Sequence, residues 1–266
     1  MDIFGNNIVQ ESIKFIQKSF GSETAFLGFS GGKDSIVNEH LFKMSGVKYE
    51  LYYSFTGLDA PQVIQFIRKH YPQCKFLMPR QTFWRALSVK VPPSNRIRWC
   101  CTLLKKEAAW KLPHRKRAMG IRSEESPNRA KYSRINHFEK LDHIHHYPIF
   151  HWKEWELWEF IGKQKLPYPE LYNQGFNRIG CVVCPYHSEP TGRLHQKYRE
   201  RWPKFFDRYE KGITDLFYKR QRQGKTMYYD TPQQFLDAWY LNNSARWYAE
   251  EKTKKIEAGG LFAHSA

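Results

Sequence analysis

The feature that most constrains the fold is a short apolar run that leads directly into a glycine turn. Residues 24–29 read Thr-Ala-Phe-Leu-Gly-Phe, and residues 30–35 read Ser-Gly-Gly-Lys-Asp-Ser. The apolar run predicts a buried strand, and the pattern after it predicts a helix from Asp34 to Met44. A strand that enters a helix through such a turn is typical of a parallel α/β sheet.

The glycine turn has the chemistry of a phosphate site. Backbone N–H groups at the start of a helix carry partial positive charge, and Gly31 and Gly32 let the backbone approach an anion closely. Lys33 adds a positive charge, and Ser30 and Ser35 add hydroxyls. The spacing differs from the Walker loop, which has four residues between its glycines. The alternative interpretation is a strand–helix turn that binds no ligand.

Alternation of strands and helices continues through the first 190 residues. Further strands are predicted at 49–55, 74–78, 118–122 and 144–150, and helices at 7–19, 61–70, 100–110 and 153–163. This order predicts an α/β fold with a doubly wound, mainly parallel sheet, whose ligands bind at the carboxyl ends of the strands. Residues 79–99 are expected to form a loop. Residues 122–143 are expected to be a polar connection, either a mobile lid or a disordered linker.

The pattern changes near residue 190. Residues 1–189 are predicted to form a nucleotide-binding domain that includes the clustered cysteines, and residues 190–266 a basic helical C-terminal region. The chain has 43 Lys and Arg against 26 Asp and Glu, a net charge of +17. This excess favours an anionic partner, nucleic acid first, although a solvated basic surface is the alternative. No apolar run is long enough to span a bilayer, so we expect a cytoplasmic protein with no membrane partner.

Four of the five cysteines form two close pairs. Cys100 and Cys101 are adjacent, and Cys181 and Cys184 form a C-x-x-C motif. In a reducing compartment such pairs predict metal or redox chemistry, and four thiolates can hold zinc or a [4Fe–4S] cluster. Adjacent cysteines are awkward for a zinc ribbon, so the cluster is favoured over zinc. The alternatives are that the adjacent pair is part of a buried helix, and that Cys74 is either a buried small residue or a persulfide carrier.

These motifs resemble a known superfamily. Residues 30–35 resemble the PP-loop of the ATP pyrophosphatases, which have an adenine nucleotide alpha hydrolase-like fold. The paired cysteines downstream resemble the sulfonucleotide (PAPS/APS) reductase-like branch, in which they ligate a [4Fe–4S] cluster. Thr56-Gly57 and the segment Gly120-Ile121-Arg122-Ser123-Glu124-Glu125-Ser126 match the same branch.

The resemblance implies roles for individual residues. Ser30, Gly31, Gly32, Lys33, Asp34 and Ser35 would bind the phosphates of ATP with Mg²⁺, and Lys33 would neutralise the leaving pyrophosphate. Asp34 would orient Mg²⁺ or, alternatively, cap the helix. Thr56 and Gly57 would flank the nucleotide, and Arg122 would stabilise the α-phosphate or hold a substrate phosphate. Cys100, Cys101, Cys181 and Cys184 would ligate the cluster.

The resemblance also implies which reaction the chain catalyses. The reductases use a cysteine in a C-terminal tail, and no cysteine follows Cys184 here. The combination is similar to DndC-like and SspD-like DNA phosphorothioation proteins, which implies an ATP pyrophosphatase that activates a DNA phosphate for sulfur incorporation. A cysteine desulfurase or other sulfur donor and other phosphorothioation proteins would be its partners. The alternatives are a tRNA-thiolating enzyme, a sulfonucleotide reductase, and a nucleic-acid-binding module with a vestigial nucleotide fold.

Overall fold

A computed structural model of the chain describes residues 8–94, 97–187, 193–225 and 229–241. Two units are distinguished by their internal contacts, and each is described by itself. The first consists of Met1–Phe55, Asp59–Pro79 and Lys106–Gly180. The second consists of Thr56–Leu58, Arg80–Lys105 and Cys181–Ala266. Two earlier segments, Thr56–Leu58 and Arg80–Lys105, join the C-terminal part in the second unit, and the domain boundary after residue 189 stays a prediction.

The first unit is built on a six-stranded sheet with the strand order β3-β2-β1-β4-β6-β5. Its strands are β1 (Ala25–Phe29), β2 (Tyr49–Ser54), β3 (Lys75–Leu77), β4 (Lys116–Met119), β5 (Ile135–Phe138) and β6 (His143–His146). All neighbours pair in parallel except β5, which pairs antiparallel with β6 at one edge. The predicted doubly wound, mainly parallel sheet is therefore confirmed.

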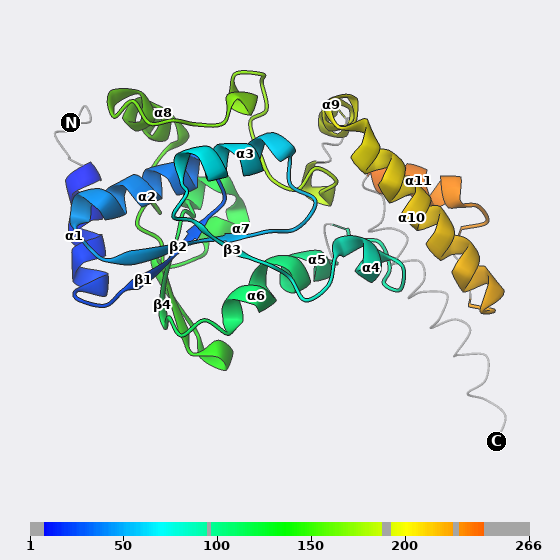
Figure 1. Cartoon of the computed structure of the whole chain (residues 1–266), viewed down its shortest axis with the longest axis horizontal. Coiled ribbons are helices and arrows are strands. Elements are labelled where there is room, and N and C mark those ends of the chain that lie inside the picture. The colour runs from blue at the N-terminus through cyan, green and yellow to red at the C-terminus, as the bar shows by residue number, and fades with distance from the viewer. Residues whose placement is uncertain (1–7, 95–96, 188–192, 226–228, 242–266) are drawn as a thin grey trace. The chain divides into compact units, whose positions relative to one another are not determined.

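Helices cover both faces of this sheet. α2 (Lys33–Ser45) and α3 (Pro61–His70) lie on one face, and α6 (Glu107–Trp110) lies on the other (Figure 1). α1 (Ile8–Phe20) and α8 (Glu154–Lys163) both pack against α2. The chain proceeds from β1 outward through β2 and β3 and then returns to β4 on the other side of β1. This reversal places a topological switch point at the carboxyl ends of β1 and β4, where ligands of such sheets bind.

The core of the first unit follows the alternation of β1. Leu27 is fully buried, and Phe26, on the other face, stacks on Tyr52 with ring centroids 4.8 Å apart. Ala109 of α6 belongs to the same cluster as these two rings. The short strand β1 is thus buried on both sides, which fixes the position of the turn that follows it.

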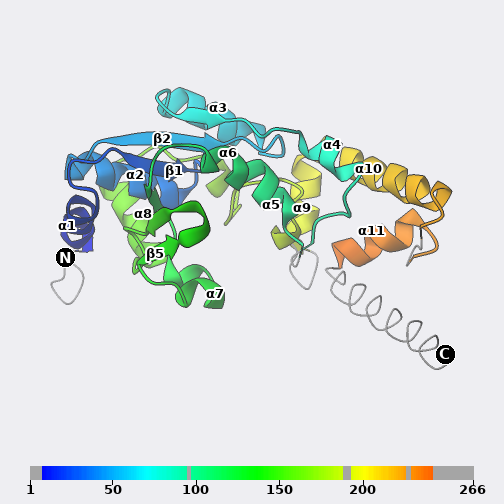
Figure 2. The same cartoon turned by 90° about the horizontal axis from the view of Figure 1, so that it is seen from below.

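The second unit is helical where the structure describes it. Its helices include α4 (Phe83–Leu87), α5 (Trp99–Cys101), α9 (Arg193–Arg201), α10 (Pro203–Arg222) and α11 (Pro232–Tyr240). Figure 2 shows α10 and α11 side by side, and the Trp239 ring of α11 lies 4.6 Å from that of Tyr209 on α10. Trp239 also donates a hydrogen bond to the carbonyl of Pro93 at 2.8 Å. A basic helical C-terminal region is therefore present as expected, with residues 242–266 outside the described part.

Two segments contain structure that the sequence analysis did not predict. Residues 79–99, expected to be a loop, contain α4, which Thr82 caps by accepting a hydrogen bond from the Arg85 N–H at 3.3 Å. Residues 122–143, expected to be a lid or a linker, contain the short helix α7 (Pro127–Ala130) and strand β5. Such short elements lack a clear periodicity and depend on capping and on strand pairing for their stability.

Among the helices of the described residues, none combines the length and the apolar character that crossing a membrane requires.

Candidate functional site

The glycine turn after β1 packs closely against helix α3. Gly31 has φ of +71°, a left-handed conformation that side chains disfavour. A Cβ atom at this position would lie 3.0 Å from the Ile67 side chain and 3.1 Å from Val63, both on α3. Glycine is therefore required twice here, by the backbone conformation and by the packing of α3.

The glycine requirement gives a stability prediction with a matched control. We expect Gly31→Ala to lower the free energy of unfolding by about 1–3 kcal/mol more than Gly46→Ala. Gly46 has the same φ of +71°, but no atom lies within 4 Å of its Cβ position. The difference between the two variants in urea denaturation therefore isolates the contact with α3. Equal losses would contradict the close packing.

The two serines of the turn bond within it. Ser35 donates a hydrogen bond to the carbonyl of Gly32 at 2.8 Å, and its oxygen accepts one from the Ser30 N–H at 3.2 Å. The two hydroxyl oxygens are 3.2 Å apart. Gly32 occupies the N-cap position of α2 without a side-chain cap. The hydroxyls therefore stabilise the turn, and the binding of phosphate by these serines stays a prediction.

Arg122 and Asp34 lie together at the switch point, where the neighbouring strands β1 and β4 end. Arg122 follows β4, is 2% exposed, and donates from Nε to the Asp34 Oδ1 at 2.6 Å. Its Nη1 also donates to Glu124 at 2.7 Å and to the carbonyl of Trp152 at 3.4 Å. Burial by itself lowers the pKa of Arg122, but the charge of Asp34 and its hydrogen bond outweigh burial and raise that pKa. Asp34 thus forms an ion pair with Arg122 and does not cap α2.

Lys33 lies beside the same carboxylates. Its side chain is largely buried, with Nζ 3.7 Å from Asp34 and 3.5 Å from Glu154 at the start of α8. The backbone N–H of Lys33 donates to the Tyr172 hydroxyl at 3.0 Å. No sequence pattern points to Glu154 or Tyr172. Neither residue belongs to a motif, and only the packing of α8 and of the following segment brings them to the turn.

Gly120 explains how β4 approaches the turn so closely. A Cβ atom at this position would lie 2.9 Å from the carbonyl oxygen of Asp34. The backbone after β4 therefore touches the first turn of α2, and any larger residue would separate the two. This contact places Arg122, two residues later, within reach of Asp34.

Thr56 lies with the cysteines in the second unit. Its hydroxyl is 3.5 Å from the Cys181 sulfur and accepts a hydrogen bond from the Leu58 N–H at 3.1 Å. Gly57 has φ of +72°, which a tight turn requires. The contact of Thr56 and Gly57 with a nucleotide stays a prediction.

The four paired cysteines all belong to the second unit. A hydrogen bond from Cys100 lowers the pKa of the Cys101 thiol to about 5, and the positive charge of Arg98 acts in the same direction. The same hydrogen bond, burial and the negative charges of Cys101, Cys181 and Cys184 raise the pKa of Cys100. The four sulfur atoms are therefore close enough to interact electrostatically.

The donor set suits a soft metal centre. Four thiols come from two chain segments of the second unit, and thiolates are the usual ligands of iron–sulfur clusters. Among the residues that the structure describes, however, no three His, Cys, Asp or Glu side chains are grouped in a way that could hold a metal ion. The residues fit a [4Fe–4S] cluster by the chemistry of their thiols, and their grouping around a cluster and its ligation stay predictions.

Cys74 is separate from this group. It belongs to the first unit, is buried, and burial raises the pKa of its thiol to about 12. A thiol that stays protonated at neutral pH is a poor nucleophile. Cys74 therefore has the environment of a buried small residue, not of a persulfide carrier.

The chain is similar in sequence to proteins of a known family. A sequence model of the phosphoadenosine phosphosulfate reductase domain matches residues 24–187. An uncharacterized protein of Methanocaldococcus jannaschii is 30% identical over 218 residues, which are 77% of this chain and 45% of that protein. An adenosine 5'-phosphosulfate reductase of Shouchella clausii is 24% identical over 185 residues, which are 65% of this chain and 75% of that protein. The chain therefore spans less than half the length of the archaeal relative.

A solved structure also matches. The phosphoadenylyl-sulfate (PAPS) reductase from Candida auris superimposes with a TM-score of 0.50 at 17% sequence identity. The match covers 68% of this chain and 90% of that one. At this identity the likeness concerns the fold alone, and it agrees with the strand order described above.

Proposed function

Because the chain belongs to the phosphoadenosine phosphosulfate reductase domain family, we propose that it is an ATP pyrophosphatase acting on nucleic acid. One observation carries the proposal. The turn 30–35 lies at the switch point of the sheet, at the N-terminus of the 13-residue helix α2, with Lys33 and Arg122 beside it. Two cations and a helix N-terminus at this position suit the polyphosphate of a nucleotide.

The proposed acceptor is a phosphate of the DNA backbone. A non-bridging oxygen of that phosphate attacks the α-phosphorus of ATP, and the bond to pyrophosphate breaks. Sulfide then attacks the DNA phosphorus and expels AMP, which takes with it the oxygen that the DNA has lost. The net charge of +17 supports a nucleic-acid acceptor over a small neutral one.

The residues of the turn have defined tasks in this step. Negative charge develops on the oxygens of the α-phosphate and on the departing pyrophosphate, so catalysis depends on fixed positive groups. The N–H groups that start α2, together with Lys33, receive the pyrophosphate. Arg122 is held by Asp34 and Glu124 and contributes a charge whose position does not change. Both oxygens of Asp34 face a cation, so we propose that Mg²⁺ enters with ATP.

The cysteines would serve the sulfur step. Cys100, Cys101, Cys181 and Cys184 would hold the [4Fe–4S] cluster. When bound, a cluster whose four irons are each ligated by one of these cysteines would act through its charge. The sulfur would come from a cysteine desulfurase partner.

An isotope experiment tests the acceptor. Anaerobically prepared protein is incubated with MgATP, sodium sulfide and DNA whose non-bridging phosphate oxygens are ¹⁸O, and the AMP is analysed by mass spectrometry. We expect AMP that carries one ¹⁸O atom from the DNA. AMP without the label would show that water is the acceptor and would contradict DNA activation.

The alternatives give different products in parallel reactions. A tRNA thiolase would form AMP only when tRNA replaces DNA. A sulfonucleotide reductase, which the similarity to adenosine 5'-phosphosulfate reductases supports, would consume adenylyl sulfate with a thiol and release sulfite and AMP. A nucleic-acid-binding module without catalysis would bind the polymers and leave all nucleotides intact.

Glu154 gives a prediction about nucleotide affinity. Its carboxylate faces Lys33 at 3.5 Å and competes with a phosphate for that charge. Because the Glu154 side chain is 54% exposed and screened by solvent, we expect Glu154→Gln to tighten ATP binding only about 2- to 5-fold. Calorimetry at fixed ionic strength measures the change. Glu159→Gln, which removes an exposed charge from the same helix, should leave the affinity unchanged, and weaker binding by Glu154→Gln would contradict the competition.

A further inference from the structure

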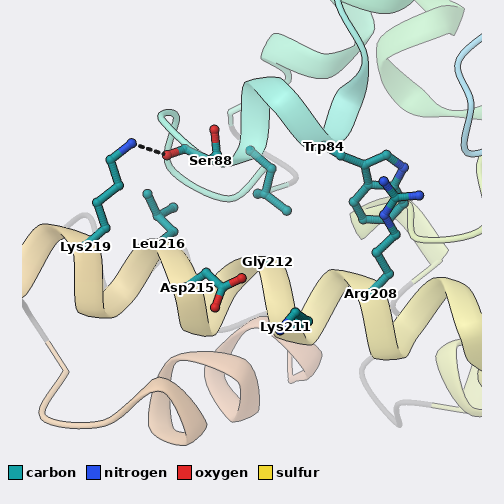
Figure 3. A pocket seen from close by; sticks show the side chains of 9 residues that line it. Trp84, Ser88, Arg208, Lys211, Gly212, Asp215, Leu216 and Lys219 are labelled. Atoms are coloured by element: carbon teal, nitrogen blue, oxygen red, sulfur yellow. Dashed lines mark hydrogen bonds between the residues drawn. The ribbon is translucent and has the colours of Figure 1, made fainter.

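The second unit contains a groove that the proposed chemistry does not use. It lies between α4 and α10, has a volume of about 250 Å³, and is shown from close by in Figure 3. Its lining includes an aromatic and an apolar side chain, Trp84 and Leu87, and four charged side chains, Arg208, Lys211, Asp215 and Lys219. The volume is below the roughly 300–1,000 Å³ of typical small-molecule sites. A whole nucleotide cofactor would therefore not be enclosed, whereas part of a longer ligand could lie along the groove.

The helix spacing of α10 builds one wall of the groove. Arg208, Lys211, Asp215 and Lys219 follow one another at intervals of three or four residues, so they share one face of the helix. Arg208 and Lys219 are eleven positions apart, about 16 Å along the axis. Gly212 on the same face lets α10 approach α4, because a Cβ atom there would lie 3.0 Å from Leu87.

The polar groups of this face are mainly cationic. Arg208, Lys211 and Lys219 outnumber the single carboxylate of Asp215, and within the described residues no ion pair joins these three cations to a carboxylate. Lys219 instead donates to the backbone carbonyl of Ser88 at 3.1 Å (Figure 3). Cations without acidic partners on a surface attract anions. A row about 16 Å long is long enough to meet more than one phosphate of a nucleic-acid strand.

The aromatic ring of Trp84 lies at the Arg208 end of this row of charged residues. The Arg208 guanidinium stacks on the Trp84 ring at 4.4 Å from its centroid (Figure 3). The Phe83 ring meets the Trp84 ring edge-on, with centroids 5.2 Å apart, and so restricts its orientation. Aromatic rings and guanidinium planes are the surfaces on which unpaired bases stack.

We propose that this groove binds one strand of nucleic acid. Lys211 and Lys219 contact phosphates of the strand, and an unpaired base stacks on the plate that the Arg208 guanidinium forms with the Trp84 ring. The apolar side chain of Leu87 and the stacked Trp84 and Arg208 favour an unpaired nucleic-acid strand over an acidic peptide, because an acidic peptide would contact the cations alone. This inference rests on the proposed function for the identity of the polymer, and it assigns the binding of that polymer to named residues of the second unit.

A binding experiment without ATP tests the groove. The probe is a fluorescein-labelled 20-nucleotide single-stranded DNA, titrated with the full chain at several salt concentrations. We expect Lys211→Gln with Lys219→Gln to weaken binding and to reduce the slope of log K against log salt by about 1.4, or 0.7 for each lost phosphate contact. Trp84→Ala should weaken binding roughly 5- to 150-fold with little change in slope.

Two control variants distinguish binding in the groove from the effect of bulk charge and from loss of folding. Lys69→Gln removes the same charge from an exposed position on α3 of the first unit, and its effect on slope and affinity should be small. Trp84→Phe keeps an aromatic ring and should retain most of the affinity, which separates stacking from loss of folding. Equal effects of Lys69→Gln and Lys211→Gln would overturn the groove, because bulk charge would then explain the binding. Equal binding of poly-glutamate, unaffected by Trp84→Ala, would also overturn it.

The test separates this inference from the proposed reaction. If the groove variants lose DNA affinity but the protein cleaves no ATP, the groove stands and the proposed function fails. If ATP is cleaved in a DNA-dependent way while the groove variants bind DNA normally, the reaction stands and the groove is overturned.

Discussion

Replacing Lys33 by alanine is expected to lower the rate of pyrophosphate release from ATP by about 10²–10³-fold. The Nζ of Lys33 is the positive charge nearest to the leaving group in the proposed step, and it acts inside a largely buried site. Loss of one such group removes stabilisation that the transition state needs more than the bound substrate does. Single-turnover measurements with saturating ATP would show the loss in the rate constant.

The neighbouring lysine of the same helix provides the control. Lys43 lies on α2, is 51% exposed, and pairs with Glu39 at 3.0 Å, away from the glycine turn. Lys43→Ala should retain full activity, and Lys33→Ala should still bind single-stranded DNA with normal affinity. Full turnover by Lys33→Ala would show that the turn does not receive the leaving pyrophosphate.

Replacing Arg122 by methionine is expected to lower the free energy of unfolding by about 3–5 kcal/mol. Arg122 is 2% exposed, and its removal takes away the cation that lies 2.6 Å from Asp34 and 2.7 Å from Glu124, leaving Asp34 with the more distant Lys33 Nζ at 3.7 Å. A surface ion pair would cost far less. Arg115, whose pair with Asp142 is exposed on both sides, should lose at most about 1 kcal/mol as Arg115→Met.

A second variant separates charge from packing at this position. If the cost arises from unpaired carboxylates, then Arg122→Met combined with Asp34→Asn and Glu124→Gln should recover part of the lost stability. Urea denaturation followed by circular dichroism measures all of these variants. A loss below 1 kcal/mol for Arg122→Met, or no recovery in the combined variant, would contradict the view that Arg122 holds these two carboxylates in place.

Much of the first unit could be predicted from local sequence. Thr24–Ser35 encodes a strand, a turn and a helix start in consecutive residues, and the structure has β1, the turn and α2 there. The parallel order followed from the alternation of strands and helices. The short elements α4, α7 and β5 could not be found this way, because four or five residues carry too little periodicity and their stability comes from capping and pairing.

The candidate site was predicted only in part, for a physical reason. The residues of the turn and Arg122 lie in motifs at strand ends, so sequence could bring them together. Glu154 and Tyr172 reach Lys33 only through the packing of segments distant in sequence, and no local pattern marks them. The spacing of the cysteines predicted two pairs, and all four residues belong to the second unit, whereas ligation of a cluster depends on side-chain positions that spacing does not determine and stays a prediction.

The most direct test of the account is the identity of the nucleotide products. Anaerobically prepared protein is incubated with ATP labelled in the α-phosphate, Mg²⁺, sulfide and DNA, and the products are separated by chromatography. The account predicts AMP and pyrophosphate in equal amounts, formed only when DNA is present and lost in Lys33→Ala. ADP with inorganic phosphate, or intact ATP under every condition, would contradict it.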